Sequence, residues 1–87
     1  MPEFHRHKRF KKSYKNLPTK VQEAAKYRLK LFVSDPFNKI LNNHSLRGEY
    51  QGCRSINVTG DFRIAYSEED KGDILLIDIG THSQLYG

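Results

Sequence analysis

The spacing of apolar residues in the first third of the chain predicts one short strand followed by a helical hairpin. Residues 3–7 alternate in polarity, as a strand does. Phe10, Tyr14 and Leu17 then recur at i, i+4 and i+7, on one face of a first helix. A second helix is predicted to begin at Pro18 or Thr19 and to end at Asp35-Pro36. Its apolar stripe comprises Val21, Ala25, Leu29 and Phe32.

The second half of the chain changes to the period of two that is typical of strands. Residues 37–49 are predicted to form a loop, and strands are predicted over residues 52–58, 62–67 and 74–79. The third strand is apolar on both parities, which indicates a central place in the sheet. We therefore expect a single domain over residues 1–87 of the α+β class, with the short first strand and the helical hairpin packed on an antiparallel sheet.

The same period sorts the strand side chains by face. If Phe62, Ile64 and Tyr66 pack under the helices, Ser55, Asn57 and Arg63 line an open polar face. Asp61 has the parity of Arg63, whereas Arg54 has the core parity and is expected at a sheet edge or with a partner. A polar, partly cationic sheet face of this kind could hold a phosphodiester.

The chain's charge is unevenly distributed, which is compatible with a polyanionic partner, although a solvated helix face with ordinary lysines explains it equally well. Residues 1–50 hold 12 Lys and Arg against 4 Asp and Glu, whereas residues 51–87 hold 3 against 6. Such a basic half raises affinity for any nucleic acid without selecting a sequence. The lone Cys53, the lack of an apolar leader in residues 1–12 and the lack of a membrane-spanning stretch predict a cytoplasmic protein.

The C-terminal segment follows the most apolar run of the chain after a single breaker, Gly80. The strand is therefore expected to end there and to present His82 and Tyr86 side by side. Imidazole can donate or accept a proton near neutral pH, and a tyrosine ring can stack on a base. On local spacing alone, a strand followed by a capping stub, with Tyr86 simply closing the core, is the favoured interpretation of the segment.

Three segments together resemble the RelE/ParE toxin superfamily, and within it the YafQ branch. They are His44-Ser45-Leu46-Arg47-Gly48-Glu49-Tyr50-Gln51-Gly52-Cys53-Arg54, Gly60-Asp61-Phe62-Arg63-Ile64-Ala65-Tyr66 and Ile79-Gly80-Thr81-His82-Ser83-Gln84-Leu85-Tyr86. The resemblance implies the RelE-like fold and a ribosome-associated mRNA endonuclease neutralised by a cognate antitoxin. It also implies metal-independent cleavage, in which the substrate's 2′-OH attacks the adjacent phosphate.

The resemblance also implies roles for individual residues. His82 matches the general acid, and Arg63 matches the cation that stabilises phosphate charge. Asp61 matches an acidic position that acts as general base or orients a neighbouring histidine, and His44 is the competing candidate for the base. Tyr86 matches an aromatic position that stacks on or positions a base, and Phe62 and Arg54 are further expected substrate contacts. Asn57 stands where the YafQ pattern has a histidine and can hydrogen-bond phosphate but cannot titrate.

Other interpretations of these residues remain open at this point. His44 lies in an Asn-rich turn and could bond only backbone, and Arg63 could pair with Asp61 or Asp78 across strands. His5 and His7 lack a partner set at metal-ligand spacing, so we expect solvated side chains and no metal or cofactor. The competing functions are a non-catalytic ParE-like toxin that binds gyrase and a basic nucleic-acid-binding module without activity.

Overall fold

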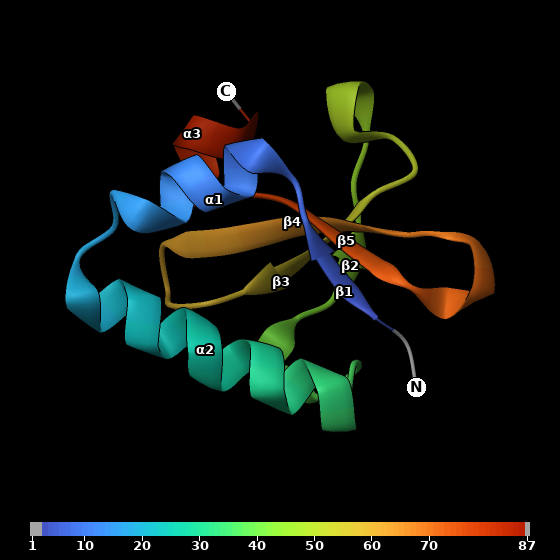
Figure 1. The fold of residues 1–87 in the computed structure, drawn as a ribbon, viewed down its shortest axis with the longest axis horizontal. Helices are drawn as coiled ribbons and strands as arrows, with labels where there is room; N and C mark the ends of the chain where they lie inside the picture. The colour runs from blue at the N-terminus through green and yellow to red at the C-terminus, as the bar shows by residue number, and fades with distance from the viewer. Residues whose placement is uncertain (1–2, 87) are drawn as a thin grey trace.

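Five strands form one mixed sheet in the computed structural model, which describes residues 3–86. The elements in chain order are β1 (Phe4–Arg6), α1 (Lys8–Lys15), α2 (Thr19–Ser34), β2 (His44–Ser45), β3 (Arg54–Asn57), β4 (Phe62–Glu68), β5 (Ile74–Thr81) and α3 (His82–Tyr86). The sheet order is β1-β5-β4-β3-β2, with β1 parallel to β5 and the other neighbours antiparallel. Figure 1 shows α1 and α2 as a hairpin beside the strands, with α3 close to α1. The predicted α+β class is confirmed.

The helical hairpin forms where the apolar spacing predicts it. His7 caps α1, because its Nδ1 accepts a hydrogen bond of 3.0 Å from the Arg9 amide. Pro18 and Asp35 flank α2 as its N-cap and C-cap, as expected from the two prolines. Phe10 on α1 and Phe32 on α2 are buried against the sheet.

The core lies between α2 and one face of β3, β4 and β5. Ile56, Ile64 and Tyr66 are almost fully buried there, and the Phe32 ring meets Tyr66 edge-on at 4.9 Å. The Tyr66 hydroxyl accepts a hydrogen bond of 2.8 Å from Asn43, so the one polar atom of this large side chain is satisfied. Burial raises the pKa of Tyr66, which keeps that hydroxyl protonated.

Two predictions about the strands need correction. Residues 37–49 are not only a loop, because His44 and Ser45 form β2 and pair with Ser55 and Arg54 of β3. The strand Ile74–Thr81 is internal, as its apolar character indicates, but β4 and not β5 occupies the middle of the sheet. A two-residue strand has too short a pattern to be recognised, and it forms only because β3 offers an edge.

The predicted break at Gly80 is also wrong. β5 continues through Gly80 to Thr81, and α3 begins at His82. The glycine leaves room for the Gln84 side chain, because a Cβ on residue 80 would lie 2.9 Å from Gln84 Oε1. Gly80 therefore allows the last helix to fold back tightly onto the end of its own strand.

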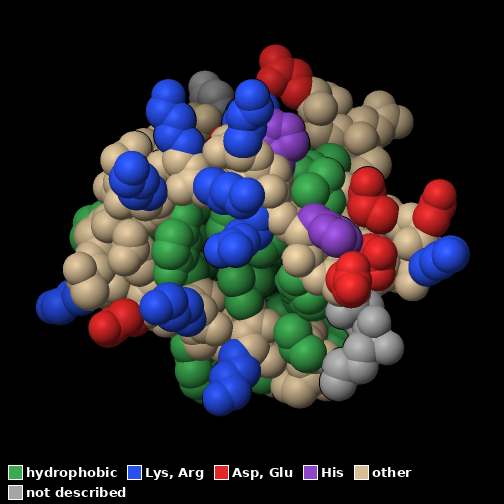
Figure 2. All heavy atoms as spheres, viewed as in Figure 1, with side chains coloured by type: hydrophobic (Ala, Val, Ile, Leu, Met, Phe, Trp, Pro, Cys, Tyr) green, Lys and Arg blue, Asp and Glu red, His purple; other side chains and the backbone are tan. Residues whose placement is uncertain are grey.

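The charge asymmetry of the sequence persists on the surface. In Figure 2, Lys and Arg side chains gather over α1 and α2, and Asp and Glu side chains gather near the turn between β4 and β5. Among the described helices, none combines the length and the apolar character that crossing a bilayer requires. The basic surface thus belongs mainly to the helical hairpin.

Candidate active site

The strand register brings the predicted polar residues to one face of the sheet, opposite the core. His44 lies opposite Ser55, and Ser55 lies opposite Ala65. In the next row of that face, Asn57 lies opposite Arg63, and Arg63 lies opposite Gly80. Residues opposite each other in a ladder project to the same side. His44, Ser55, Asn57 and Arg63 therefore share one face, which is the arrangement expected from the period of two.

This face is not open at Ser55, because α3 folds over it. Ser55 is fully buried, and its Oγ accepts a hydrogen bond of 2.7 Å from the Tyr86 hydroxyl. Asn57 and Arg63 are half-buried beside it. The prediction of an open face is therefore corrected: it is polar, and Tyr86 covers its middle.

A capping box holds α3 in place. The Gln84 amide donates to Thr81 Oγ1 at 3.1 Å, and the Thr81 amide donates to Gln84 Oε1 at 2.8 Å. The sequence signal for this helix start was present in Thr81-His82-Ser83-Gln84, and our sequence prediction missed it. One helical turn then separates His82 from Tyr86, whose rings meet at 4.8 Å with an interplanar angle of 75°.

Tyr86 is fixed on several sides. Besides the bond to Ser55, its ring lies edge-on to that of Tyr50 at a centroid distance of 6.1 Å. Burial raises its pKa above the ordinary value of 10.0, although the bond to Ser55 and the positive charge of Arg63 act in the opposite direction. The hydroxyl is therefore protonated at neutral pH and donates to Ser55.

Arg63 presents a positive charge that no carboxylate neutralises within residues 3–86. Its Nη1 donates to the carbonyl oxygens of Thr59 at 3.0 Å and of Phe62 at 3.1 Å. Asp78 instead accepts hydrogen bonds from Ser13 at 2.7 Å and Arg9 at 3.3 Å. The alternative in which Arg63 pairs with Asp61 or Asp78 is therefore wrong.

Asp61 and His82 are neighbours through the main chain. The His82 amide donates to the Asp61 carbonyl at 3.2 Å, and both side chains are exposed. Thr59 Oγ1 accepts hydrogen bonds from the amides of Asp61 and Phe62, which shapes the turn. In the part of the chain described, no hydrogen bond or ion pair engages the Asp61 carboxylate or the His82 ring nitrogens, so both groups face solvent.

His44 and Asn57 are held in different ways. His44 Nδ1 lies 2.7 Å from the carbonyl oxygen of Asn42, and because a carbonyl can only accept, Nδ1 carries the proton. In the neutral imidazole Nε2 is then the acceptor nitrogen, and it has no partner among residues 3–86. Asn57 Oδ1 is buried and likewise has no hydrogen-bond partner within this range. An acceptor left in this state is uncommon in folded proteins.

Two residues predicted to contact substrate, Arg54 and Phe62, do not lie on the polar face of the sheet. Arg54 lies on the core side, where its Nε donates to Asn43 Oδ1 at 2.7 Å and its guanidinium sits 5.4 Å from the Phe37 ring centroid. The expectation that Arg54 has a partner is confirmed. Its position on the core side does not support the prediction that it contacts substrate. Phe62 is half-buried and packs against the core cluster.

Sequence reasoning missed a network that surrounds Tyr86. The Arg9 guanidinium lies 3.3 Å from Asp78 and 3.4 Å from the Tyr50 hydroxyl, so α1, β5 and the loop before β3 are tied together. Beside Tyr50 and Tyr86 is a pocket of about 380 Å³, which Arg47, Glu49 and Gln84 also line. No local pattern could have indicated these contacts, because their residues are distant in sequence.

The comparison with known families agrees with this geometry. The family described as "Bacterial toxin of type II toxin-antitoxin system, YafQ" matches residues 2–87. The chain belongs to the YafQ family of type II toxins. The sequence matches no protein whose function has been curated.

Solved structures show that YafQ and related toxins share the fold. YafQ from E. coli strain BL21(DE3) is 22% identical with a TM-score of 0.83, and all of both chains is covered. YafQ in the E. coli DinJ–YafQ toxin–antitoxin complex is 22% identical with a TM-score of 0.80, covering 99% of this chain and 98% of that one. The YoeB/ParE toxin of Agrobacterium tumefaciens is 17% identical with a TM-score of 0.76, covering 92% and 98%. The predicted RelE-like architecture is thus confirmed.

Proposed function

We propose that this YafQ-family toxin is a cytoplasmic, ribosome-associated mRNA endonuclease that inhibits translation. The observation that carries the proposal is the position of Arg63 on the polar face. Among residues 3–86 its guanidinium bonds only carbonyl oxygens, and its strand, β4, lies in the sheet order between β3, which pairs with the strand of His44, and β5, which leads directly to His82. A guanidinium that no carboxylate among residues 3–86 neutralises, on the face that also carries His44, suits a phosphodiester undergoing cleavage.

The proposed reaction uses the substrate's own 2′-OH as nucleophile. A base takes the 2′-OH proton, the 2′-oxygen forms a bond to phosphorus, and the bond to the 5′-oxygen breaks. His82 gives the leaving 5′-oxygen a proton, and Arg63 stabilises the charge that develops on the phosphate. The products are a 2′,3′-cyclic phosphate and a 5′-OH. Because Arg63 supplies the positive charge, this scheme assigns no step to a metal ion.

Placement on the sheet favours His44 over Asp61 as the base. The attacking and leaving oxygens lie on opposite sides of the phosphorus in an in-line displacement. Asp61 is bonded through its main chain to His82 and so lies on the acid's side. His44 lies on β2, two strands away from Arg63, and its Nε2, which has no partner among residues 3–86, can accept a proton when the ring is neutral. We assign Asp61 the role of orienting His82.

The remaining polar-face residues are assigned to substrate binding. The Tyr86 ring, held by Ser55 and Tyr50, positions a base, and its protonated hydroxyl keeps the ring uncharged. Asn57, half-buried and opposite Arg63 on this face, is assigned a hydrogen bond to the substrate. The basic surface of α1 and α2 contacts ribosomal RNA without base specificity.

We further propose that a cognate antitoxin neutralises this chain. YafQ of E. coli has been solved in complex with DinJ, and a basic toxin surface suits an acidic or amphipathic antitoxin segment. Such a segment would cover the polar face or displace α3. A toxin–antitoxin complex that cleaves RNA at the full rate of the toxin alone would contradict this mode of neutralisation.

Induction of the chain without an antitoxin tests the proposed function. Translation should stop first, and primer extension on cellular mRNA should show discrete cuts within coding regions. The His82→Gln variant, induced in parallel, should give neither effect while accumulating as folded protein. Loss of DNA supercoiling with intact mRNA would contradict the proposal and favour a gyrase-binding toxin.

A further inference from the structure

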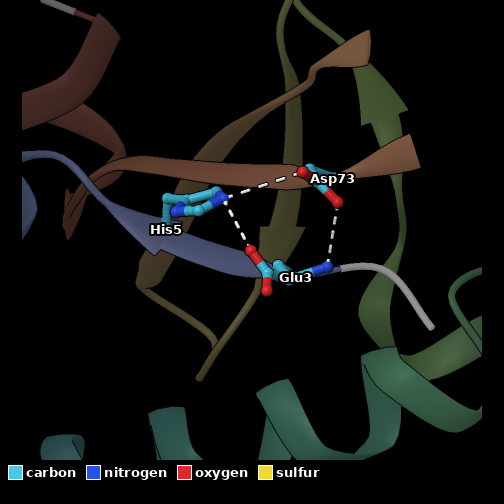
Figure 3. Close-up of side chains that lie close together, drawn as sticks. All are labelled: Glu3, His5 and Asp73. Atoms are coloured by element: carbon cyan, nitrogen blue, oxygen red, sulfur yellow. Dashed lines mark hydrogen bonds and ion pairs between the residues drawn. The ribbon is translucent and has the colours of Figure 1, made fainter. Parts of the chain in front are cut away.

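Three side chains with metal-binding atoms converge at the edge of the sheet formed by β1 and the start of β5 (Figure 3). His5 Nε2 lies 3.6 Å from Glu3 Oε2 and 3.7 Å from Asp73 Oδ2, and all three ligand atoms lie within 4.8 Å of one another. These separations are too long for hydrogen bonds. They are close to the spacing of roughly 3.4 Å between ligand atoms of a tetrahedral zinc ion.

The backbone ladder, rather than the side chains, brings this cluster together. β1 runs parallel to β5, with His5 opposite Leu75, and Glu3 precedes β1 on the same face as His5. The Glu3 amide donates to Asp73 Oδ1 at 3.0 Å, which engages one carboxylate oxygen and leaves Oδ2 directed at His5 (Figure 3). The ligand atoms are therefore placed before any ion arrives.

We propose that Glu3, His5 and Asp73 bind one divalent transition-metal ion, with zinc as the representative ion and water completing the coordination. Imidazole combined with carboxylates favours zinc over magnesium or calcium, which prefer all-oxygen ligands. The side chains of His5 and Glu3 are 53% and 76% exposed, so the site is open to water. Its affinity is therefore expected to be lower than that of a closed four-residue zinc site.

The proposed ion has a structural role and not a catalytic one. Asp73 directly precedes β5 and His82 directly follows it, so the eight-residue strand separates the two sites by roughly 26 Å. The metal ties the short edge strand β1 to β5 and stabilises that pairing. The expectation that His5 and His7 are both merely solvated is thus revised, because His7 caps α1 and His5 faces Asp73.

Calorimetric titration with zinc chloride tests this inference. The protein is the full-length untagged chain carrying His82→Ala, which removes an exposed imidazole from the candidate active site. We expect one zinc ion per chain, unaffected by millimolar magnesium, and a rise in Tm of about 10–20 °C at zinc concentrations near 100 times Kd. His5→Ala, Asp73→Asn and Glu3→Gln should each weaken binding by at least about tenfold.

His7→Asn is the matched control. It removes a neighbouring imidazole but retains a side-chain acceptor for the Arg9 amide at the start of α1, so zinc binding should be unchanged. Absence of saturable binding at millimolar zinc would overturn the inference. Unchanged zinc affinity in both His5→Ala and Asp73→Asn would also overturn it. Neither result bears on RNA cleavage, because the proposed ion takes no part in that reaction.

Discussion

The two faces of the sheet differ in how completely their polar groups are paired. On the core face, Arg54 bonds Asn43 and covers the Phe37 ring, and Asn43 also satisfies the Tyr66 hydroxyl. On the opposite face, Arg63 bonds only carbonyl oxygens, and Asn57 Oδ1 has no partner within residues 3–86. The Arg54 pairing stabilises the fold, whereas the Arg63 guanidinium keeps a charge that no carboxylate among residues 3–86 neutralises and that a phosphate can engage. This difference separates the structural Arg54 from the proposed functional Arg63, which residue type alone cannot do.

His82→Gln should cause the largest loss of cleavage rate, because it removes the proposed general acid. A positioned acid contributes about 100- to 10,000-fold, and glutamine cannot supply a proton. Thr81 and Gln84 still cap α3, so the helix should persist. Single-turnover cleavage of ribosome-bound mRNA measures the loss, with Ser83→Ala as a control in the same helix. A His82→Gln variant that cleaves at the parental rate would move the acid role to another residue.

The base assignment can be sharpened by comparing His44→Ala with Asp61→Asn. Loss of the base should slow cleavage by about 100-fold or more, and His44→Ala should show this loss. Asp61→Asn keeps the main-chain bond to His82 and should cost roughly tenfold at most, the lower end of positioning effects. Rates for both variants should be measured across pH. If Asp61→Asn has the larger effect, the roles of the two residues are reversed.

Gly80→Ala tests whether tight packing of α3 keeps the polar face in order. The added Cβ would lie 2.9 Å from Gln84 Oε1 and displace it from the Thr81 amide, at a cost of about 1–2 kcal/mol in the free energy of unfolding. Gly60→Ala is the matched control, since a Cβ there meets no atom within 4 Å. Urea denaturation of both variants measures the difference. Equal stability of the two variants would argue against this packing.

Tyr86→Phe should have the smallest effect, about 1 kcal/mol of stability at neutral pH through loss of the bond to Ser55. The pKa of Tyr86 is raised by burial, so the folded state holds its proton more tightly than the unfolded state. The contribution of Tyr86 to the free energy of unfolding should therefore be fully present below pH 10.0 and be lost as the pH rises above that value.

The phenylalanine variant should lose less stability over the same alkaline range. Tyr66 and Cys53, whose pKa values are also raised by burial, still contribute to a decline in both proteins. Urea denaturation at pH 7 and at alkaline pH gives the comparison. An equal alkaline decline in the parent and in Tyr86→Phe would show that the Tyr86 hydroxyl is not protected by burial.

Much of the fold follows from local patterns in the sequence. The spacing of Phe10, Tyr14 and Leu17 predicts α1, and the prolines at 18 and 36 set the limits of α2. The period of two predicts β3 and β4 and correctly assigns their faces. These elements are predictable because their apolar stripes are long enough to show a period.

The remaining features depend on contacts between distant segments. β2 exists only because two residues meet the edge of β3, and Ser55 is buried only because Tyr86 folds back over it. The bond between Arg9 and Asp78 joins α1 to β5 and has no local signature. The candidate site was therefore predictable as a set of residues on one face, but its coverage by α3 was not.

A comparison of Arg63→Gln with Arg54→Gln tests the central claim most directly, because these arginines lie on adjacent strands and opposite faces. Cleavage of ribosome-bound mRNA and urea denaturation should be measured for both. Arg63→Gln should slow cleavage by about 100- to 1,000-fold with little change in the free energy of unfolding. Arg54→Gln should cleave close to the parental rate while losing about 1–3 kcal/mol of stability. The opposite result, parental cleavage by Arg63→Gln and strongly impaired cleavage by stable Arg54→Gln, would contradict the account.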